Sequence, residues 1–597
     1  MKYFSKYRAY LLMSAMLGSA FLPHAAFADP STPNDSVQAA PAKPEDAPNK
    51  KAQDKQPDVS FGDYLAGKFA EENGDTENSV KFLRGSLARN PENKEIMTNL
   101  YNALIASGNV QEAVPIAKKL GSIKVPEEGN EFPPQLILTI DACKRGDFAE
   151  ARKYLQDVPK AGFNSVLLPL LTAWVKLGNG EIKAPIEPKD IFPNGKMLLA
   201  HIYLNAAMIN EIAGFKDVAA QQYEAATGET SIESSRATEA LANYYYRKGD
   251  KDNYNKFLKQ YTATHGENVF SSLPFGDTPM KPLVGNATEG VAESLYTVAS
   301  IFHGVRTPAD EITTLKIALY LRPDFPLAQF LLAGAYELKR SFPQAIASYK
   351  DINQDSIYYS QSRIMMAYDE NELGHKDEAL SELDAIAQDK PHEISALLAK
   401  GDILRTGNDF QGAIEAYDSA LERVKTPKKP HWIIYFSRGI CYDHLGNFEK
   451  TETDLKKAMA LSPGEPDVLN YLGYSWLVKH RNLAEAKKMI SEAYDARPED
   501  AEIIDSMGYA LYIDGDFASA QEYFEQALER IPNDPTINDH LGDAYWQMGR
   551  KTEAGYQWQR ALDNKPDEEE KKELLKKVAN GIASIAPSKK ASKSAVQ

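Results

Sequence analysis

The chain is poor in the features that mark several common classes of protein. It has two cysteines in 597 residues, Cys143 and Cys441, too few for the disulfide framework of an exported domain. We expect each to be a small core residue. The Gly-x-x-x-x-Gly-Lys phosphate loop, the Gly-x-Ser-x-Gly elbow and the paired histidines of zinc proteases do not occur in the sequence. We therefore expect no catalytic residues, no cofactor and no metal site, and classify the protein as not an enzyme.

The chain also has fewer basic than acidic residues, 68 Lys and Arg against 84 Asp and Glu. The formal net charge is −16 at pH 7. Binding nucleic acid requires a concentrated basic face, so this balance disfavours a nucleic-acid partner. Beyond the N-terminus, no uninterrupted apolar run approaches the roughly 18 residues that a membrane-crossing helix needs. The mature chain is accordingly expected to have no transmembrane segment.

The N-terminus has the pattern of an export signal. Three basic residues precede an apolar run at 11–22, and Ala26-Phe27-Ala28 is a small-x-small cleavage site. Residues 1–28 are therefore predicted to be a signal peptide, with an uncleaved anchor as the alternative. Cleavage removes Lys2, Lys6 and Arg8 and takes the formal charge from −16 to −19.

A repeat dominates the remaining sequence. Glycine or alanine occupies position 8 of eight successive blocks, spaced mostly 34 residues apart: Ala299, Ala333, Ala367, Gly401, Gly439, Gly473, Gly508 and Gly542. A period of this length is typical of solenoid proteins. Apolar residues at three- and four-residue steps predict two amphipathic helices in each block. In the last block, Gly549 is placed to end the first helix in a left-handed cap.

The small residues indicate close helix packing. Two antiparallel helices joined by a short turn must approach closely, and position 8 of the first helix is expected to meet position 20 of the second. Position 20 is alanine in six blocks: Ala345, Ala379, Ala413, Ala486, Ala520 and Ala554. A bulky side chain forced into such a contact should cost roughly 1–3 kcal/mol.

This pattern resembles the tetratricopeptide repeat family over about residues 292–566. The resemblance implies an all-α fold, a right-handed α-solenoid of helical hairpins in which each repeat touches only its neighbours and the first helices line a concave groove. The chain then divides into the signal peptide, a disordered Pro/Ala-rich linker (29–58), degenerate repeats (59–263), a non-helical Gly/Pro-rich crossing (264–290), eight repeats (291–566), a C-terminal capping helix (567–586) and a disordered basic tail (587–597).

The resemblance also implies which side chains face the groove, namely positions 2, 5, 9 and 12 of each first helix. In the last three repeats these are acidic or aromatic: Asp467, Asn470, Tyr474, Glu502, Asp505, Tyr509, Tyr512, Asp539, Asp543 and Trp546. Carboxylates and tyrosine hydroxyls suit an extended backbone or a segment bearing Lys or Arg, and the rings supply contact area. A solvated acidic surface is the alternative interpretation. The Lys and Asn with which many eukaryotic members clamp a peptide carboxylate are missing, and His540 is expected to be structural.

Two stretches have a narrower resemblance. DSMGYALY at 505–512 and NDHLGDAYWQMGR at 538–550 are similar to the last repeats of envelope tetratricopeptide proteins of Gram-negative bacteria. Some of those proteins are adaptors that hand cell-wall hydrolases to a C-terminal-processing protease. The resemblance implies a periplasmic, non-enzymatic scaffold whose partners are proteins, with an envelope protease and its substrates as candidates. The alternative is a structural assembly subunit of an envelope biogenesis or polysaccharide export complex.

Overall fold

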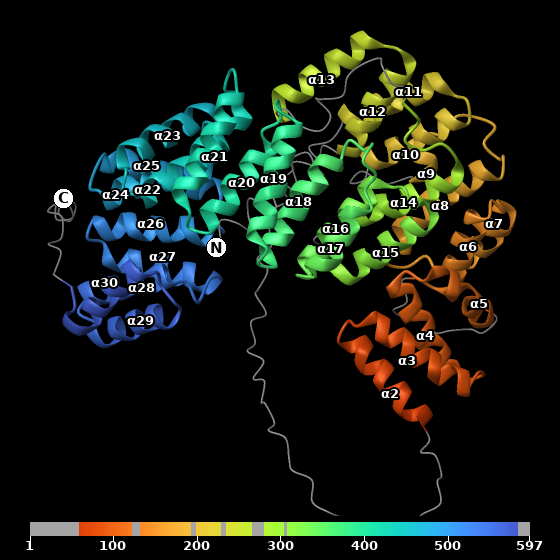
Figure 1. Ribbon diagram of the computed structural model, residues 1–597, viewed down its shortest axis with the longest axis horizontal. Helices are drawn as coiled ribbons and strands as arrows, with labels where there is room; N and C mark the ends of the chain where they lie inside the picture. The colour runs from red at the N-terminus through yellow and green to blue at the C-terminus, as the bar shows by residue number, and fades with distance from the viewer. Residues whose placement is uncertain are drawn as a thin grey trace, which may run out of the picture. The chain divides into compact units, whose positions relative to one another are not determined.

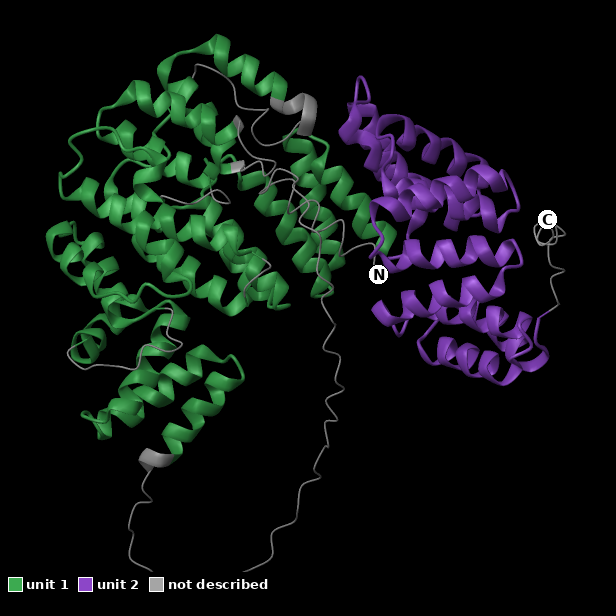
Figure 2. Cartoon of the chain, turned by 180° about the vertical axis from the view of Figure 1, so that it is seen from behind, with its two compact units in different colours: residues 1–20, 42–406 green, residues 21–41, 407–597 purple. Residues whose placement is uncertain are grey.

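The computed structural model describes residues 59–121, 132–192, 199–228, 235–265, 280–303 and 307–582. Within these ranges every regular element is a helix and no strand occurs, which confirms the predicted all-α class (Figure 1). The described chain packs into two compact units, one ending at Thr406 and one beginning at Gly407 (Figure 2). The predicted signal peptide, the linker at 29–58 and the tail at 587–597 lie outside the described residues.

The first unit contains the longer series of helices. In chain order they are α2 (Val59–Glu72), α3 (Thr76–Arg89), α4 (Lys94–Ser107), α5 (Val110–Gly121), α6 (Pro134–Lys144), α7 (Phe148–Gln156), α8 (Asn164–Gly178), α9 (Pro188–Ile191), α10 (Leu199–Ile212), α11 (Lys216–Gly228), α12 (Ser235–Lys248), α13 (Lys251–His265), α14 (Ala287–Ile301), α15 (Pro308–Leu321), α16 (Pro326–Leu338), α17 (Phe342–Lys350), α18 (Tyr359–Glu372), α19 (Lys376–Asp389) and α20 (Ser395–Thr406).

The second unit continues the alternation of helix and short turn. Its helices are α21 (Phe410–Arg423), the 3-10 turn η2 (Lys429–His431), α22 (Trp432–His444), α23 (Phe448–Leu461), α24 (Pro466–Val478), α25 (Leu483–Ala496), α26 (Ala501–Ile513), α27 (Phe517–Arg530), α28 (Pro535–Gln547), α29 (Lys551–Asp563) and α30 (Glu568–Asn580). Consecutive helices pack in pairs, α22 on α23, α24 on α25, α26 on α27 and α28 on α29. From α14 onward two helices follow each other in every predicted block, as an α-solenoid requires.

The crossing points of these pairs leave almost no room for a side chain. A Cβ at Gly473 would lie 2.8 Å from Ile490 Cγ1 and 2.9 Å from the Ala486 carbonyl oxygen. A Cβ at Gly542 would lie 2.5 Å from Trp558 Nε1. Position 8 of the first helix therefore meets the region of position 20 on the second, as the sequence predicts. The left-handed turn at Gly549 is also present, with φ at +82°.

In the first unit, some helices pack on helices that are distant in the sequence. Helix α14 packs on α6, α8 and α10, which come much earlier in the chain, and α15 packs on α4. Gly290 makes room for this return, because a Cβ there would lie 2.0 Å from the Trp174 ring. The indole Nε1 of Trp174 in turn donates to Asn205 Oδ1 at 2.9 Å. The expectation that each repeat would touch only its neighbours is therefore wrong for this unit.

The predicted non-helical crossing at 264–290 is wrong at both ends. Helix α13 continues to His265, and α14 begins at Ala287. The start of α14 is set by Asn286, whose side-chain oxygen accepts from the Glu289 amide at 3.0 Å. Residues 266–279 lie outside the described ranges. The many glycines and prolines of this stretch predict a loop, and composition alone does not distinguish a loop residue from Asn286, which caps a helix.

The structure shows the environment of the two cysteines and the length and composition of the helices. Cys143 and Cys441 are both fully buried, and burial raises the pKa of the Cys143 thiol to about 12. None of the helices in the described part of the chain combines the length and the apolar composition that crossing a bilayer requires.

The helix crossings predict opposite outcomes for two matched substitutions. Gly473→Ala should lower the free energy of unfolding by about 1–3 kcal/mol, because the new methyl meets a backbone oxygen that cannot move aside. Gly439→Ala places its Cβ 3.4 Å from Asp454 and Leu455, an ordinary contact, and should stabilise the helix by up to about 1 kcal/mol. Urea unfolding followed by circular dichroism measures both changes. Equal effects of the same sign would contradict the steric account.

Candidate partner-binding face

The ten residues predicted to face the groove lie on three successive first helices of the second unit. Helix α24 carries three of them, α26 four and α28 three, and α26 packs against both α24 and α28. The side chains at the centre come into contact across these helices. Tyr474 and Tyr509 have ring centroids 5.3 Å apart, and the Tyr509 ring is 4.8 Å from that of His540. We call the cluster of Tyr474, Asp505, Tyr509, Asp539, His540, Asp543 and Trp546 the acidic row.

Asp505 in this row is held by His540. The imidazole Nδ1 lies 2.9 and 3.0 Å from the two carboxylate oxygens of Asp505, and both side chains are 9% exposed. The Tyr474 hydroxyl is 3.4 Å from His540 Nε2 on the other side of the ring. Burial alone would lower the pKa of His540, but the charge of Asp505 and its hydrogen bond outweigh burial and raise it. Within the row, His540 is therefore the ionic partner of Asp505.

Asp539 and Asp543 share a cation that comes from the capping helix α30. The ammonium of Lys577 lies 2.7 Å from each carboxylate oxygen of Asp539 and 2.8 Å from Asp543 Oδ2. The second oxygen of Asp543 accepts from Trp558 Nε1 at 2.9 Å. Burial and the neighbouring charge of Asp539 raise the pKa of Asp543 despite the opposing effect of Lys577. The row therefore contains a site that binds an ammonium group, and the chain itself fills it.

The segment that follows α30 covers Trp546. The indole Nε1 of Trp546 donates to the main-chain oxygen of Ile582 at 2.8 Å. Gly581 has a φ of +68° and lies so close to the indole that a Cβ would be 1.9 Å from Trp546 Cζ2. The end of the row thus makes two kinds of contact with the chain's own C-terminal segment, one to an ammonium and one to a backbone carbonyl.

Several of the ten predicted residues are less accessible than a groove lining would be. Asn470, Asp505 and Tyr512 are each 6% exposed, so a partner cannot reach them directly, and their expected role as contacts becomes one of support. Asp467 is bound by Arg497, whose Nη1 lies 2.9 Å from its carboxylate. Glu502 and Tyr509 are partly exposed. Lys577 and His540 were not among the predicted site residues. Both are basic residues in an acidic part of the sequence, and this is the feature from which their pairing with the carboxylates could have been predicted.

No group of three or more His, Cys, Asp or Glu side chains in the described residues could hold a metal ion. The side chains of the row make ion pairs, hydrogen bonds and ring contacts. Its carboxylates accept charge-assisted bonds from an ammonium or guanidinium, and its rings offer flat apolar area beside them.

A comparison with family models identifies the repeat. The model described as tetratricopeptide repeat matches residues 364–430, 398–466 and 506–569. The chain contains tetratricopeptide repeats. The last match begins within α26, after Asp505, and includes all of α28. Tetratricopeptide proteins generally serve as scaffolds for protein–protein interaction.

Curated relatives match the chain over part of their length. A TPR repeat-containing protein of Pseudomonas aeruginosa is 29% identical over 148 residues, which are 25% of this chain and 24% of that relative. Tetratricopeptide repeat protein 16 of Macaca fascicularis is 26% identical over 239 residues, which are 34% of this chain and 26% of that relative. The chain therefore spans about a quarter of the length of these curated relatives.

Solved structures of helical-repeat proteins also match. The APC/C hetero-tetramer Cut9–Hcn1 matches at 13% identity and a TM-score of 0.38, over 87% of this chain and 96% of that chain. A tetratricopeptide repeat protein from Parabacteroides merdae matches at 16% identity and a TM-score of 0.34, over 42% of this chain and 98% of that chain.

Replacing Lys577 should loosen α30 from the row. Lys577→Gln leaves two neighbouring carboxylates without their shared cation, and loss of such charged hydrogen bonds costs about 1.5–3 kcal/mol. Amide hydrogen exchange in α30 should therefore accelerate. Lys576→Gln is the control, because Lys576 is 67% exposed on the same helix and its pair with Glu573 contributes about 0–1 kcal/mol. Equal exchange rates in the two variants would show that Lys577 does not hold the helix.

The Asp505–His540 pair predicts a pH dependence of stability. The folded pKa of His540 is raised, so its contribution is fully present below the unfolded pKa of about 6.5 and is lost as pH rises through the folded pKa. The free energy of unfolding of the wild type should therefore fall relative to that of His540→Gln as pH rises above about 6.5. Glutamine retains a donor for Asp505, and the other histidines are the same in both proteins. A pH-independent difference between the two would contradict a charged His540.

Proposed function

We propose that this tetratricopeptide protein is a non-enzymatic scaffold whose acidic row binds partner segments bearing Lys or Arg. The observation that carries the proposal is the position of the Lys577 ammonium, 2.7–2.8 Å from the carboxylates of Asp539 and Asp543. A lysine from a partner can make the same bonds when it replaces Lys577. Charge-assisted bonds of this length are among the stronger polar contacts in proteins.

The neighbouring groups favour a peptide over a small cation. Trp546 donates to a main-chain oxygen of the chain's own C-terminal segment, so the row binds backbone as well as an ammonium. The rings of Tyr474 and Tyr509 lie beside the carboxylates and supply contact area at low conformational cost. A rigid repeat surface lowers the ordering cost of such binding.

We place this scaffold in the periplasm, with an envelope protease and its substrates as candidate partners. The predicted signal peptide at 1–28 and the resemblance of 505–512 and 538–550 to envelope adaptors support this assignment. A transient association that depends on the protease is the expected behaviour of an adaptor. A stoichiometric complex in envelope extracts would instead favour the structural assembly subunit.

Binding of a defined basic peptide tests the proposal. The probe is a fluorescein-labelled hexapeptide of alternating lysine and alanine, measured by fluorescence anisotropy with the full chain. Lys577→Gln should bind it about tenfold more tightly, equivalent to about 1.4 kcal/mol, because the internal competitor is gone. The double substitution Asp539→Asn with Asp543→Asn should weaken binding by about tenfold or more. Added salt should weaken binding to the wild type.

Two controls make the outcome specific. Lys576→Gln removes a lysine of the same helix that does not contact the row, and it should bind the peptide as the wild type does. A peptide with glutamate in place of lysine should not bind. Unchanged affinity in Lys577→Gln, or equal binding of the acidic peptide, would overturn the assignment of the row as a site for basic segments.

A further inference from the structure

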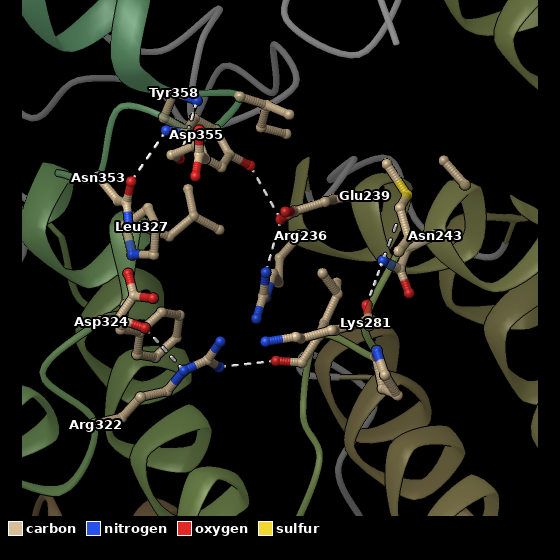
Figure 3. Close-up of a pocket in the computed structure, with 18 of the residues that line it drawn as sticks. Arg236, Glu239, Asn243, Lys281, Arg322, Asp324, Leu327, Asn353, Asp355 and Tyr358 are labelled. Carbon is tan, nitrogen blue, oxygen red and sulfur yellow. Dashed lines mark hydrogen bonds and ion pairs between the residues drawn. The ribbon is translucent and has the colours of Figure 1, made fainter. Parts of the chain in front are cut away.

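A second site lies in the first unit and does not depend on the acidic row. A cavity of about 300 Å³ opens between α12, residues 280–283 and the segments that follow α15 and α17 (Figure 3). This volume is at the lower end of the range for small-ligand pockets. The cavity is lined by charged groups and by the partly exposed apolar residues Leu283, Pro326 and Ile357.

The buried charges at the base of the cavity already bind one another. Arg236 is 6% exposed and lies 2.6 Å from Glu293 through Nη2 and 2.7 Å from Glu239 through Nη1. The Tyr358 hydroxyl donates to the same oxygen of Glu239 at 3.0 Å. Arg236 therefore uses these two carboxylates, and the network gives the cavity a fixed base.

Arg322 is the exception among the less exposed arginines of this unit. Four arginines with side chains at most 18% exposed each pair with a carboxylate: Arg236, Arg247, Arg363 and Arg405. Within the described residues, the half-buried Arg322 donates only to main-chain oxygens, from Nε to Asp324 at 3.1 Å and from Nη1 to Leu283 at 2.8 Å. Its Nη2 is left with no hydrogen-bond acceptor in the described structure.

The surroundings of Arg322 suit an anion. Its guanidinium stacks 4.7 Å from the Phe325 ring. Burial and the nearby charge of Arg236 lower the pKa of Arg322, against the opposing charges of Glu293, Glu289 and Glu239. Figure 3 shows the guanidinium groups of Arg236 and Arg322 directed toward the centre of the cavity. An oxyanion there would occupy the open side of the Arg322 fork, because Arg236 is already bonded to Glu239 and Glu293.

The other lining groups narrow the class of anion. The exposed carboxylates of Asp324 and Asp355 also border the cavity, with the exposed Lys281 as a further cation, and the two carboxylates repel a doubly charged ligand more than a singly charged one. The partly exposed side chains of Leu283, Pro326 and Ile357 offer contact to a hydrocarbon group. We propose that this cavity binds a monocarboxylate that carries an apolar group, with Arg322 as the residue that binds the carboxylate. Such a group can come from a small organic acid or from the C-terminal residue of a peptide.

Calorimetric titration of the full chain with N-acetylleucine tests this site. The acid should bind, and N-acetylleucine amide, which lacks the charge, should not. Inorganic phosphate should bind more weakly than N-acetylleucine because of Asp324 and Asp355. Arg322→Gln should weaken N-acetylleucine binding by about 10- to 100-fold, the value of a charged hydrogen-bonded pair. Arg322→Lys keeps the charge but loses the planar fork, and it should bind with intermediate affinity.

A further titration distinguishes a small organic acid from the C-terminus of a peptide as the source of the carboxylate. A tetrapeptide ending in leucine that binds more tightly than N-acetylleucine, and loses this advantage when its terminus is amidated, identifies a peptide end; equal or weaker binding identifies a small acid. Arg84→Gln, an exposed arginine of α3, is the control and should leave binding unchanged. Equal binding of the acid and its amide to the wild-type protein, tighter binding of phosphate, or no binding of any carboxylate would overturn the proposal, even if Arg322→Gln does not fold.

Discussion

Close approach between the two helices of a hairpin is the constraint on which the rest of this protein depends. At Gly473 and Gly542 the partner helix lies where a side chain would begin, so these positions can hold almost nothing larger than hydrogen. Tight pairing sets successive first helices side by side. That spacing brings Tyr474, Tyr509 and His540, from three different repeats, into ring contact. The acidic row is thus a consequence of backbone proximity.

The close packing of successive first helices also places several carboxylates near one another, and their negative charge requires cations nearby. Asp505, Asp539 and Asp543 come from neighbouring turns of α26 and α28, and unpaired carboxylates at this depth would be destabilising. The chain supplies two cations, one within the row and one from the capping helix. His540 binds Asp505, and Lys577 binds the other two carboxylates. The first cation is fixed in the core of a repeat, whereas the second belongs to a helix at the end of the solenoid. Because Lys577 lies on that terminal helix, the proposed exchange with a partner's lysine would leave the repeat itself unchanged.

Local pattern was enough to predict the helices but not their distant contacts. The period of 34 residues and the small residues at positions 8 and 20 predict the hairpins and their crossing points, because both follow from helix geometry within one block. The packing of α14 on α8 was not predictable, since it depends on Trp174 meeting Gly290 across more than a hundred residues. The same limit applies to the row. Repeat register places Asp539 and Asp543 on one face, but it contains no information about a lysine from α30.

The first unit differs from the second in that helices distant in the sequence pack on one another. There the helices return on themselves, and a buried Arg236 with two glutamates joins α12 to α14. Arg322 stands beside this network without a carboxylate of its own in the described structure. Arg236 is bonded to two carboxylates, whereas Arg322 donates only to main-chain oxygens, and this difference in partners is what distinguishes the structural ion pair from the proposed ligand site.

Zero-length carbodiimide cross-linking, read by mass spectrometry, tests the exchange of Lys577 for an external lysine most directly. Without added peptide, Lys577 should couple to Asp539 or Asp543, because its ammonium lies within 2.8 Å of both carboxylates. Increasing amounts of a lysine-containing peptide should reduce this internal link and replace it with a peptide link at the same two aspartates. An internal link that persists undiminished while the peptide couples elsewhere would contradict the account.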